Sequence, residues 1–169
     1  MRDWAELEDV YLSVYREPPY REDTADAARF RETVARHSRV PGFALTTVHN
    51  GGELGGFAYG VGREAGWWHP AAATPAPDSL ARGPLFYVYE LAVRPALRGR
   101  GHGGGLLRDL LAGRPEPFAV LAATAAAPAY AMYLRWGWER IGLLTSGSDL
   151  LALSLPERPR VPRPRERPR

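Results

Sequence analysis

A run of glycines in the middle of the chain follows a stretch of apolar and aromatic residues. The stretch Leu85–Val93 contains one charged residue, Glu90, and the glycine-rich segment R-G-R-G-H-G-G-G follows at residues 98–105. Glycine allows successive backbone N–H groups to approach one point closely, and the start of a helix adds partial positive charge. The sequence therefore predicts a phosphate-binding loop at Arg98–Gly104, immediately before a helix.

Two common phosphate-binding loops do not fit this segment. A P-loop requires a lysine after its last glycine, and all 22 basic residues of this chain are arginine. The dinucleotide fingerprint G-x-G-x-x-G is formally matched at Gly99, Gly101 and Gly104. However, the chain has no acidic residue between Glu116 and Glu139, where the ribose partner of that fingerprint belongs. A glycine-rich connector without function is the remaining alternative, and the cost of glycine at a helix start argues against it.

Glu90 is the one charged residue of the stretch Leu85–Val93. An unpaired charge is costly to bury, and desolvation raises the pKa of a carboxyl group, which makes it a better base. Glu90 is therefore a candidate general base, and a structural carboxylate paired with a buried arginine is the alternative. Strict alternation along the strand predicts two faces, one with Tyr87, Tyr89, Leu91 and Val93 and the other with Val88, Glu90 and Ala92.

Helices and strands alternate around these residues. Apolar residues at helical spacing predict a first helix from Trp4 to Val14 and a second one that begins at Asp23 or Thr24 and ends before Pro41. Strands are expected at Gly42–His49, Glu53–Val61, Leu85–Val93, Phe118–Ala123, Trp138–Leu143 and Asp149–Leu155. Two further helices are expected at Gly103–Leu111 and Pro128–Trp136. Hairpins at both ends, with strand–helix units between them, predict an α/β (mixed α+β) domain in which helices cover a mixed sheet.

Composition and charge favour one folded domain followed by a polar tail. Hydrophobic residues make up 45% of the 169 residues, and residues 1–155 are expected to form the domain. Residues 156–169 hold six arginines and two glutamates, so the tail carries +4 and, since the whole chain carries +3, residues 1–155 carry −1. The Pro/Arg-rich tail is expected to be disordered, and the nearly neutral domain argues against a nucleic-acid-binding protein.

Composition also disfavours several other classes of protein. No run of apolar residues reaches the ~20 that a membrane span needs. The first six residues do not resemble a signal peptide, so a cytoplasmic location is expected. Without cysteine, the chain has no disulfide and no thiolate nucleophile. His37, His49 and His69 lack the spacing of metal ligands, so no metal site is expected.

Two segments together resemble one known family. Arg98–Gly103 has the form R-x-x-G-x-G, with V-x-P upstream at Val93–Pro95 and two leucines downstream. This segment resembles the coenzyme A pyrophosphate loop of the GNAT N-acetyltransferase superfamily. The segment A-Y-A-M-Y-L-R-W-G-W at residues 129–138 resembles that superfamily's A-x-x-x-Y-x-x-x-G-F pattern, with Trp138 in place of Phe. The sequence is similar to bacterial, small-molecule-type members of the superfamily.

The resemblance implies the GNAT fold, with a central twisted mixed sheet, helices on both faces and strands that splay apart at the coenzyme A site. It also implies that the family's first strand has no counterpart here, because the chain begins almost inside its first helix. Acetyl-CoA is the implied co-substrate. The residues implied to bind it are Leu91, Ala92, Val93, Arg98, Gly99, Arg100, Gly101, His102, Gly103, Gly104, Ala126 and Tyr133.

The resemblance also assigns chemistry to Tyr133, which matches the family's general acid and would protonate the departing thiolate. A packing role is the alternative for Tyr133, as for Tyr130 three residues earlier, and the spacing to Gly137 favours Tyr133 as the acid. Glu90 remains the expected base. The implied reaction is direct attack of a primary amine on the thioester, without a covalent enzyme intermediate.

The amine acceptor is expected to bind between the first two helices and residues 62–84, a segment rich in Gly, Ala and Pro. Tyr20, Trp67 and Trp68 would form the walls of this pocket, with Glu90 inside it. Alternatively, the two tryptophans clamp the segment onto the domain. The nearby acidic residues Glu17, Glu22, Asp23 and Glu64 would favour a cationic amine there, and ordinary surface charges are the alternative.

The leading functional hypothesis is therefore a small-molecule N-acetyltransferase. A protein or peptide N-acetyltransferase and a coenzyme A-binding module without catalysis are alternatives. A groove open enough for a peptide would favour the first alternative, whereas an aromatic-walled pocket would favour a small molecule. The sequence leaves the oligomeric state open, with a homodimer among the alternatives.

Overall fold

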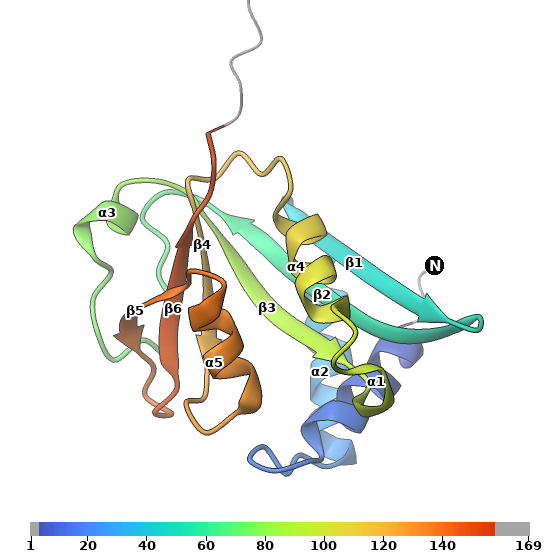
Figure 1. Ribbon diagram of the computed structural model, residues 1–169. Helices are drawn as coiled ribbons and strands as arrows, with labels where there is room; N and C mark the ends of the chain where they lie inside the picture. The colour runs from blue at the N-terminus through green and yellow to red at the C-terminus, as the bar shows by residue number, and fades with distance from the viewer. Residues whose placement is uncertain (1–3, 158–169) are drawn as a thin grey trace, which may run out of the picture.

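A six-stranded mixed sheet forms the centre of the molecule in the computed structural model, which describes residues 4–157 (Figure 1). The strand order is β1-β2-β3-β4-β6-β5. The strands are β1 (Phe43–Asn50), β2 (Glu53–Arg63), β3 (Leu85–Val93), β4 (Phe118–Ala123), β5 (Glu139–Leu143) and β6 (Asp149–Ser154). β3 and β4 pair in parallel, and the other neighbouring strands are antiparallel. The predicted mixed sheet is thus confirmed.

Helices cover both faces of the sheet (Figure 1). On one face lie α1 (Ala5–Tyr15) and α2 (Thr24–His37), whose apolar residues pack with Phe57 and Tyr59 of β2. On the other face lie α4 (His102–Leu111) and α5 (Pro128–Arg135), which pack with Phe86 and Val88 of β3. The short helix α3 (Asp78–Ala81) and the 3-10 turn η1 (Pro95–Leu97) lie in the connections on either side of β3.

The second helix begins where its sequence predicts. The Asp23 side chain accepts hydrogen bonds from the backbone N–H groups of Ala25 and Asp26, at 2.9 and 3.0 Å. The Asp26 side chain in turn accepts one from the Asp23 N–H, at 2.9 Å. This reciprocal capping box satisfies N–H groups that the first helical turn leaves without partners. It fixes the connection between α1 and α2, which reaches the candidate site.

A β-bulge in β3 changes the direction of its side chains. Tyr59 of β2 pairs with Glu90, but the next residue, Gly60, pairs with Val88, so Tyr89 is an extra residue in β3. The strict alternation expected for this strand is therefore wrong beyond Val88. Ala92 packs with the α1/α2 cluster, as Tyr89 does, whereas Leu91 and Val93 join Val88 on the α4/α5 face.

Strands β3 and β4 separate halfway along their length. Their pairing runs from Leu85–Phe118 to Val88–Leu121, and β3 then continues to Val93 without a partner on that side. The two strands visibly diverge in Figure 1. The bulge at Tyr89 lies at the point of separation, where added twist turns β3 away from β4. The splayed strands implied by the sequence resemblance are confirmed.

Two features concern the limits of the domain. Within residues 4–157 the first element is α1. The tail predicted at residues 156–169 lies almost entirely outside the described residues. None of the described helices is long and apolar enough to cross a membrane.

Candidate active site

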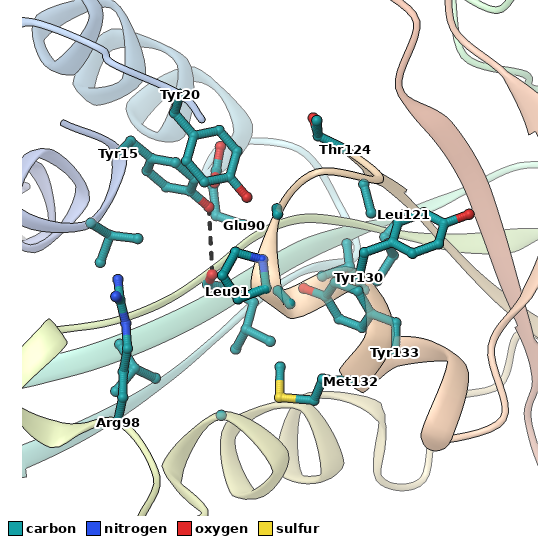
Figure 2. Close-up of a pocket in the computed structure, with 18 of the residues that line it drawn as sticks. Tyr15, Tyr20, Glu90, Leu91, Arg98, Leu121, Thr124, Tyr130, Met132 and Tyr133 are labelled. Carbon is teal, nitrogen blue, oxygen red and sulfur yellow. Dashed lines mark hydrogen bonds between the residues drawn. The ribbon is translucent and has the colours of Figure 1, made fainter. Parts of the chain in front are cut away.

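A cavity of about 680 Å³ lies where β3 and β4 diverge. Its lining comes from both faces of the sheet (Figure 2). Leu91, Leu121 and Tyr133 belong to the side covered by α4 and α5, whereas Tyr15 and Tyr20 belong to the α1 side. Because the strands are unpaired here, a ligand entering from one face can meet a ligand entering from the other.

The glycine-rich loop forms one mouth of this cavity. Gly99 and Gly101 have φ angles of 76° and 80°, in the left-handed region where a side chain is strained. Gly101 is the N-cap of α4 and offers no side chain to the first backbone N–H groups of that helix. A Cβ atom added at either glycine would meet nothing within 4 Å. The space above the helix start is therefore open, as an approaching phosphate group requires.

Trp136 covers the next part of the loop. A Cβ atom added at Gly104 would lie 3.3 Å from the Trp136 ring, so a residue with a side chain would displace this ring. The Trp136 ring also lies edge-on to the Tyr133 ring, with 6.1 Å between centroids. Sequence analysis missed Trp136 and the neighbouring Arg135, which both line the cavity. Their position between Tyr133 and Gly137 is the signal that could have indicated them.

Tyr133 reaches the centre of the cavity from α5. It is only 8% exposed, and its ring packs against Trp136 and Trp138. No hydrogen bond to its hydroxyl is seen among residues 4–157, and the hydroxyl points into the cavity (Figure 2). Burial raises the pKa of Tyr133, with smaller contributions from Tyr20 and Glu90. The phenol therefore keeps its proton at neutral pH and can donate it into the cavity.

Glu90 reaches the same cavity from the bulge in β3. Burial raises the pKa of its carboxyl group to about 8, while a hydrogen bond from Tyr15 lowers it and the charge of Glu22 raises it. None of the ion pairs within the described part of the chain includes Glu90. The alternative of a carboxylate paired with a buried arginine therefore finds no support, and a pKa near 8 suits a group that exchanges protons near neutrality.

Several solved acetyltransferase structures are similar to the whole domain. One is a histone acetyltransferase HPA2 and related acetyltransferase from Corynebacterium glutamicum, with a TM-score of 0.63, 22% identity and coverage of 94% of each chain. Another is a GNAT family acetyltransferase from Brucella melitensis in complex with acetyl-CoA, with a TM-score of 0.59, 19% identity and coverage of 93% of this chain and 85% of that one. A third is an aminoglycoside 6'-acetyltransferase type Ii, with a TM-score of 0.60, 18% identity and coverage of 92% and 91%.

The chain has the GNAT fold. No protein-family model matches its sequence, and no curated protein does either. The similarity is thus one of backbone architecture, and it includes the mixed sheet and its splayed strands. The order of helices and strands expected from the sequence patterns agrees closely with the observed order.

The second mouth of the cavity in this GNAT fold is aromatic and acidic. Tyr11, Tyr15 and Tyr20 line it together with Glu22 and Glu90. The Tyr15 hydroxyl faces the Leu91 carbonyl oxygen at 3.5 Å, and the Tyr15 and Tyr20 rings lie edge to face with centroids 4.8 Å apart (Figure 2). The role of Tyr11 and Tyr15 in this lining was missed in the sequence. Their i, i+4 spacing on the first helix was the available signal.

The tryptophan pair lies elsewhere, and the pocket wall expected from it must be corrected. Trp67 packs edge-on against Tyr87, with ring centroids 5.4 Å apart, and Trp68 donates a hydrogen bond to the Thr74 carbonyl oxygen at 2.9 Å. Neither residue lines the cavity. Both instead cover the apolar cluster around Leu85, which is the alternative role of clamping residues 62–84 onto the domain.

Three residues expected to bind the coenzyme also lie outside the cavity lining. Ala92 points toward α1 and α2 because of the bulge, and it is buried there. Arg100 and Ala126 are exposed. The other expected positions are all part of the lining, namely Leu91, Val93, Arg98, Gly99, Gly101, His102, Gly103, Gly104 and Tyr133. Residues 4–157 contain no group of His, Asp and Glu side chains that could hold a metal ion.

Proposed function

We propose that this chain is an acetyl-CoA-dependent N-acetyltransferase that acetylates a primary amine of a small molecule. The observation that carries this proposal is the single cavity between β3 and β4, with the glycine-rich loop at one mouth and Glu90 and Tyr133 inside. The acetyltransferase structures that share this fold support the same activity.

The mouth of the cavity that the glycine-rich loop forms fits the pyrophosphate end of the coenzyme. Its positive-φ glycines leave the start of α4 open, and its backbone N–H groups and the Arg98 and Arg135 side chains offer donors to a pyrophosphate. Beyond Val88, the backbone of β3 has no strand on its β4 side, so its polar groups are available to an extended amide-containing arm. Acetyl-CoA supplies the thioester carbonyl carbon that a neutral amine attacks, with loss of the thiolate.

Two side chains carry out the proton transfers of this reaction. Glu90 accepts a proton from the amine nitrogen, directly or through water, as the new carbon–nitrogen bond forms. Tyr133 holds its proton until the carbon–sulfur bond breaks and then donates it to the sulfur. No covalent bond to the enzyme is required, in keeping with a chain that has no cysteine.

The acceptor mouth favours a small molecule over a peptide. Three tyrosines enclose it, and the rings of Tyr11 and Tyr15 are only 4.5 Å apart. A protein acetyltransferase would need a groove along which several residues of a peptide could lie. A cavity walled by aromatic side chains instead suits a compact amine.

Thermal denaturation with candidate ligands tests the proposed function. Acetyl-CoA and coenzyme A are expected to raise the melting temperature, and NAD is expected to leave it unchanged. Gly101→Val should abolish the shift with acetyl-CoA, because it places a branched side chain at a left-handed position beside the phosphate site. Gly147→Val is the matched control, since Gly147 also has a positive φ but lies outside the lining of the cavity. Stabilisation by NAD but not by acetyl-CoA would overturn the assignment.

A further inference from the structure

The basic and acidic side chains of the cavity lie in different parts of it. Arg98 and Arg135 lie near the glycine-rich loop, whereas Glu22 and Glu90 lie at the acceptor mouth. A third carboxylate, Glu17, pairs with Arg98 at 2.8 Å, so its charge is already balanced. No ion pair within residues 4–157 includes Glu22 or Glu90. The acceptor mouth therefore contains two carboxyl groups and no cation bound to either of them.

Glu22 is held in place from two directions. The Tyr11 hydroxyl donates a hydrogen bond to its carboxylate, and its backbone N–H donates to the Tyr15 carbonyl oxygen at 2.8 Å. Tyr11 is itself fixed, because its ring stacks on Phe30 with 4.2 Å between centroids and is 8% exposed. The positive charge of Arg29 influences Glu22, but the Arg29 guanidinium is bound to Asp26. The Glu22 carboxylate thus keeps acceptor capacity that faces the cavity.

The Tyr133 hydroxyl, on the wall of the cavity opposite Tyr15 and Tyr20, is a second and independent indication that a ligand binds in this cavity. The Tyr133 hydroxyl belongs to a side chain that is 92% buried, and within the described residues it has no hydrogen-bond partner. It points into the cavity across from Tyr15 and Tyr20 (Figure 2). A buried hydroxyl without a protein partner is expected to find one in a bound molecule or in water.

We propose that the amine acceptor carries a second amino group that stays protonated at neutral pH, and that Glu22, positioned by Tyr11, binds this second group. The inference rests on the proposed acetyltransferase function. The reacting nitrogen must lose its proton beside Glu90 and Tyr133, so it cannot neutralise Glu22 as well. A second ammonium group at another position of the same molecule can do so, and the tyrosine rings around it can add cation–π attraction. The substrate class is therefore a diamine or a longer polyamine, not a simple monoamine.

Binding to the coenzyme A complex tests this inference without turnover. The protein saturated with coenzyme A is titrated calorimetrically with 1,3-diaminopropane, 1,4-diaminobutane, 1,5-diaminopentane and, as the monoamine reference, butylamine. At least one diamine is expected to bind roughly tenfold more tightly than butylamine, which is the effect of one added charge-assisted hydrogen bond. If none of the three diamines binds more tightly than butylamine, the inference is wrong.

Variants then assign the preference to Glu22. Glu22→Gln should remove the diamine preference, and Tyr11→Phe should reduce it. In the steady state with acetyl-CoA, the loss in Glu22→Gln should appear in the KM for the diamine and not in kcat. Glu64→Gln is the control, because Glu64 is an exposed carboxylate outside the cavity, and it should keep the full preference. A Glu22→Gln protein that folds, binds acetyl-CoA and still prefers the diamine overturns the assignment.

Failure of the inference can be told apart from failure of the proposed function. If coenzyme A and acetyl-CoA do not stabilise the protein, the acetyltransferase assignment itself is wrong. If they do stabilise it and butylamine binds as tightly as every diamine, only the second cationic subsite is wrong.

Discussion

Tyr133 and Glu90 approach the same cavity from different elements, and burial changes the pKa of both. Tyr133 comes from α5 and is held as a neutral phenol, whereas Glu90 comes from β3 and titrates near 8. The proximity of Glu90 contributes to the raised pKa of Tyr133. An acid that keeps its proton and a base that loses one near neutrality are the pair that acyl transfer to an amine requires.

Tyr133→Phe should lower kcat by roughly 10²–10⁴, the usual contribution of a general acid. The affinity for acetyl-CoA should change little, because the ring and its contacts with Trp136 and Trp138 remain. Steady-state kinetics and acetyl-CoA titration measure both quantities. Tyr130→Phe is a matched control on the same helix, since the Tyr130 hydroxyl is bound to Asp149 at 2.6 Å and points away from Tyr133 (Figure 2). Wild-type turnover in Tyr133→Phe would exclude it as the acid.

The pH–rate profile should identify Glu90 as the base. In the wild-type protein, kcat/KM should rise with pH and level off above about 8, where the Glu90 carboxyl group is ionised. Glu90→Gln should be least active near neutrality and should recover in part at higher pH, as the amine deprotonates without help. Tyr133→Phe should show no such recovery. A Glu90→Gln profile of the same shape as the wild type would contradict the assignment.

The same carboxyl group should make stability depend on pH. The folded protein holds the Glu90 proton up to about pH 8, whereas the unfolded chain releases it near the ordinary value of 4.5. The free energy of unfolding should therefore fall as pH rises between these values, with each unit of difference between the two pKa values worth roughly 1.4 kcal/mol. The Glu90→Gln variant has no carboxyl group to ionise here, so its free energy of unfolding should not fall in this way. It should exceed that of the wild type only slightly below pH 4.5 and by the largest amount above about pH 8. Denaturation of both ligand-free proteins across this range measures the difference. An advantage for Glu90→Gln that does not change with pH would show that Glu90 titrates normally.

At the scale of elements, the bulge in β3 connects the sheet to the site. It turns Glu90 and Ala92 toward the α1 side and Leu91 toward the α4 side, and it lies where β3 leaves β4. Gly60 on β2 lies opposite this bulge. A Cβ atom there would be 2.5 Å from the Tyr87 carbonyl oxygen. The absence of a side chain at Gly60 is therefore what allows the two strands to approach at the bulge.

Gly60→Ala should destabilise the fold by roughly 1–3 kcal/mol, the usual cost of an overpacked core. The added methyl group would contact both backbone and the Phe86 ring, which lies 2.6 Å from its position. Gly105→Ala should instead stabilise the protein by up to roughly 1 kcal/mol, because Gly105 lies inside α4 and has room for a Cβ atom. Urea denaturation compares the two variants. Equal stability of Gly60→Ala and the wild type would show that β2 can shift to accommodate the methyl group.

At the scale of the whole molecule, the β1–β3 half and the β4–β6 half of the sheet are paired over only part of their length. At their N-terminal ends, β3 and β4 pair over four residues, from Leu85–Phe118 to Val88–Leu121. Beyond these pairs the strands diverge, and the cavity separates α4 and the β1–β3 half from α5 and the β4–β6 half (Figure 1). A coenzyme that contacts both walls of the cavity would add connections that the protein itself lacks here.

Acetyl-CoA should therefore slow amide hydrogen exchange on both walls of the gap. The largest change is expected at residues 89–93 of β3, where the backbone groups that face β4 have no strand partner, and at residues 101–104 at the start of α4. The β1–β2 hairpin turn at Asn50–Glu53 should show little change, because it lies outside the cavity lining. Exchange measured by mass spectrometry on the full chain tests this pattern. Protection confined to regions outside the gap would place the ligand elsewhere.

The sequence by itself determined the elements and the position of the glycine-rich loop. Helix and strand positions follow from local apolar periodicity and capping, and the Asp23 cap and the glycine-rich segment at residues 98–105 are local signals as well. Tyr133 was identified by its spacing to Gly137 within a single helix and turn. The positions of these elements were predicted correctly because each depends on neighbours along the chain, whereas the binding role of the loop and the role of Tyr133 stay predictions.

Tertiary structure alone decided which residues share the cavity. The bulge at Tyr89 arises from pairing with β2, which has no local signature in β3, and it reversed the predicted direction of Ala92 and Leu91. Trp67 and Trp68 were expected beside Tyr20, but they cover the cluster around Leu85 instead. Glu22 was expected near the acceptor entrance or as an ordinary surface charge, and Tyr11 only as an apolar position of the first helix. The packing of α1 and of its connection to α2 beside the gap brings both to the acceptor mouth. Strand register and helix docking depend on contacts distant in the sequence, so local pattern could not predict them.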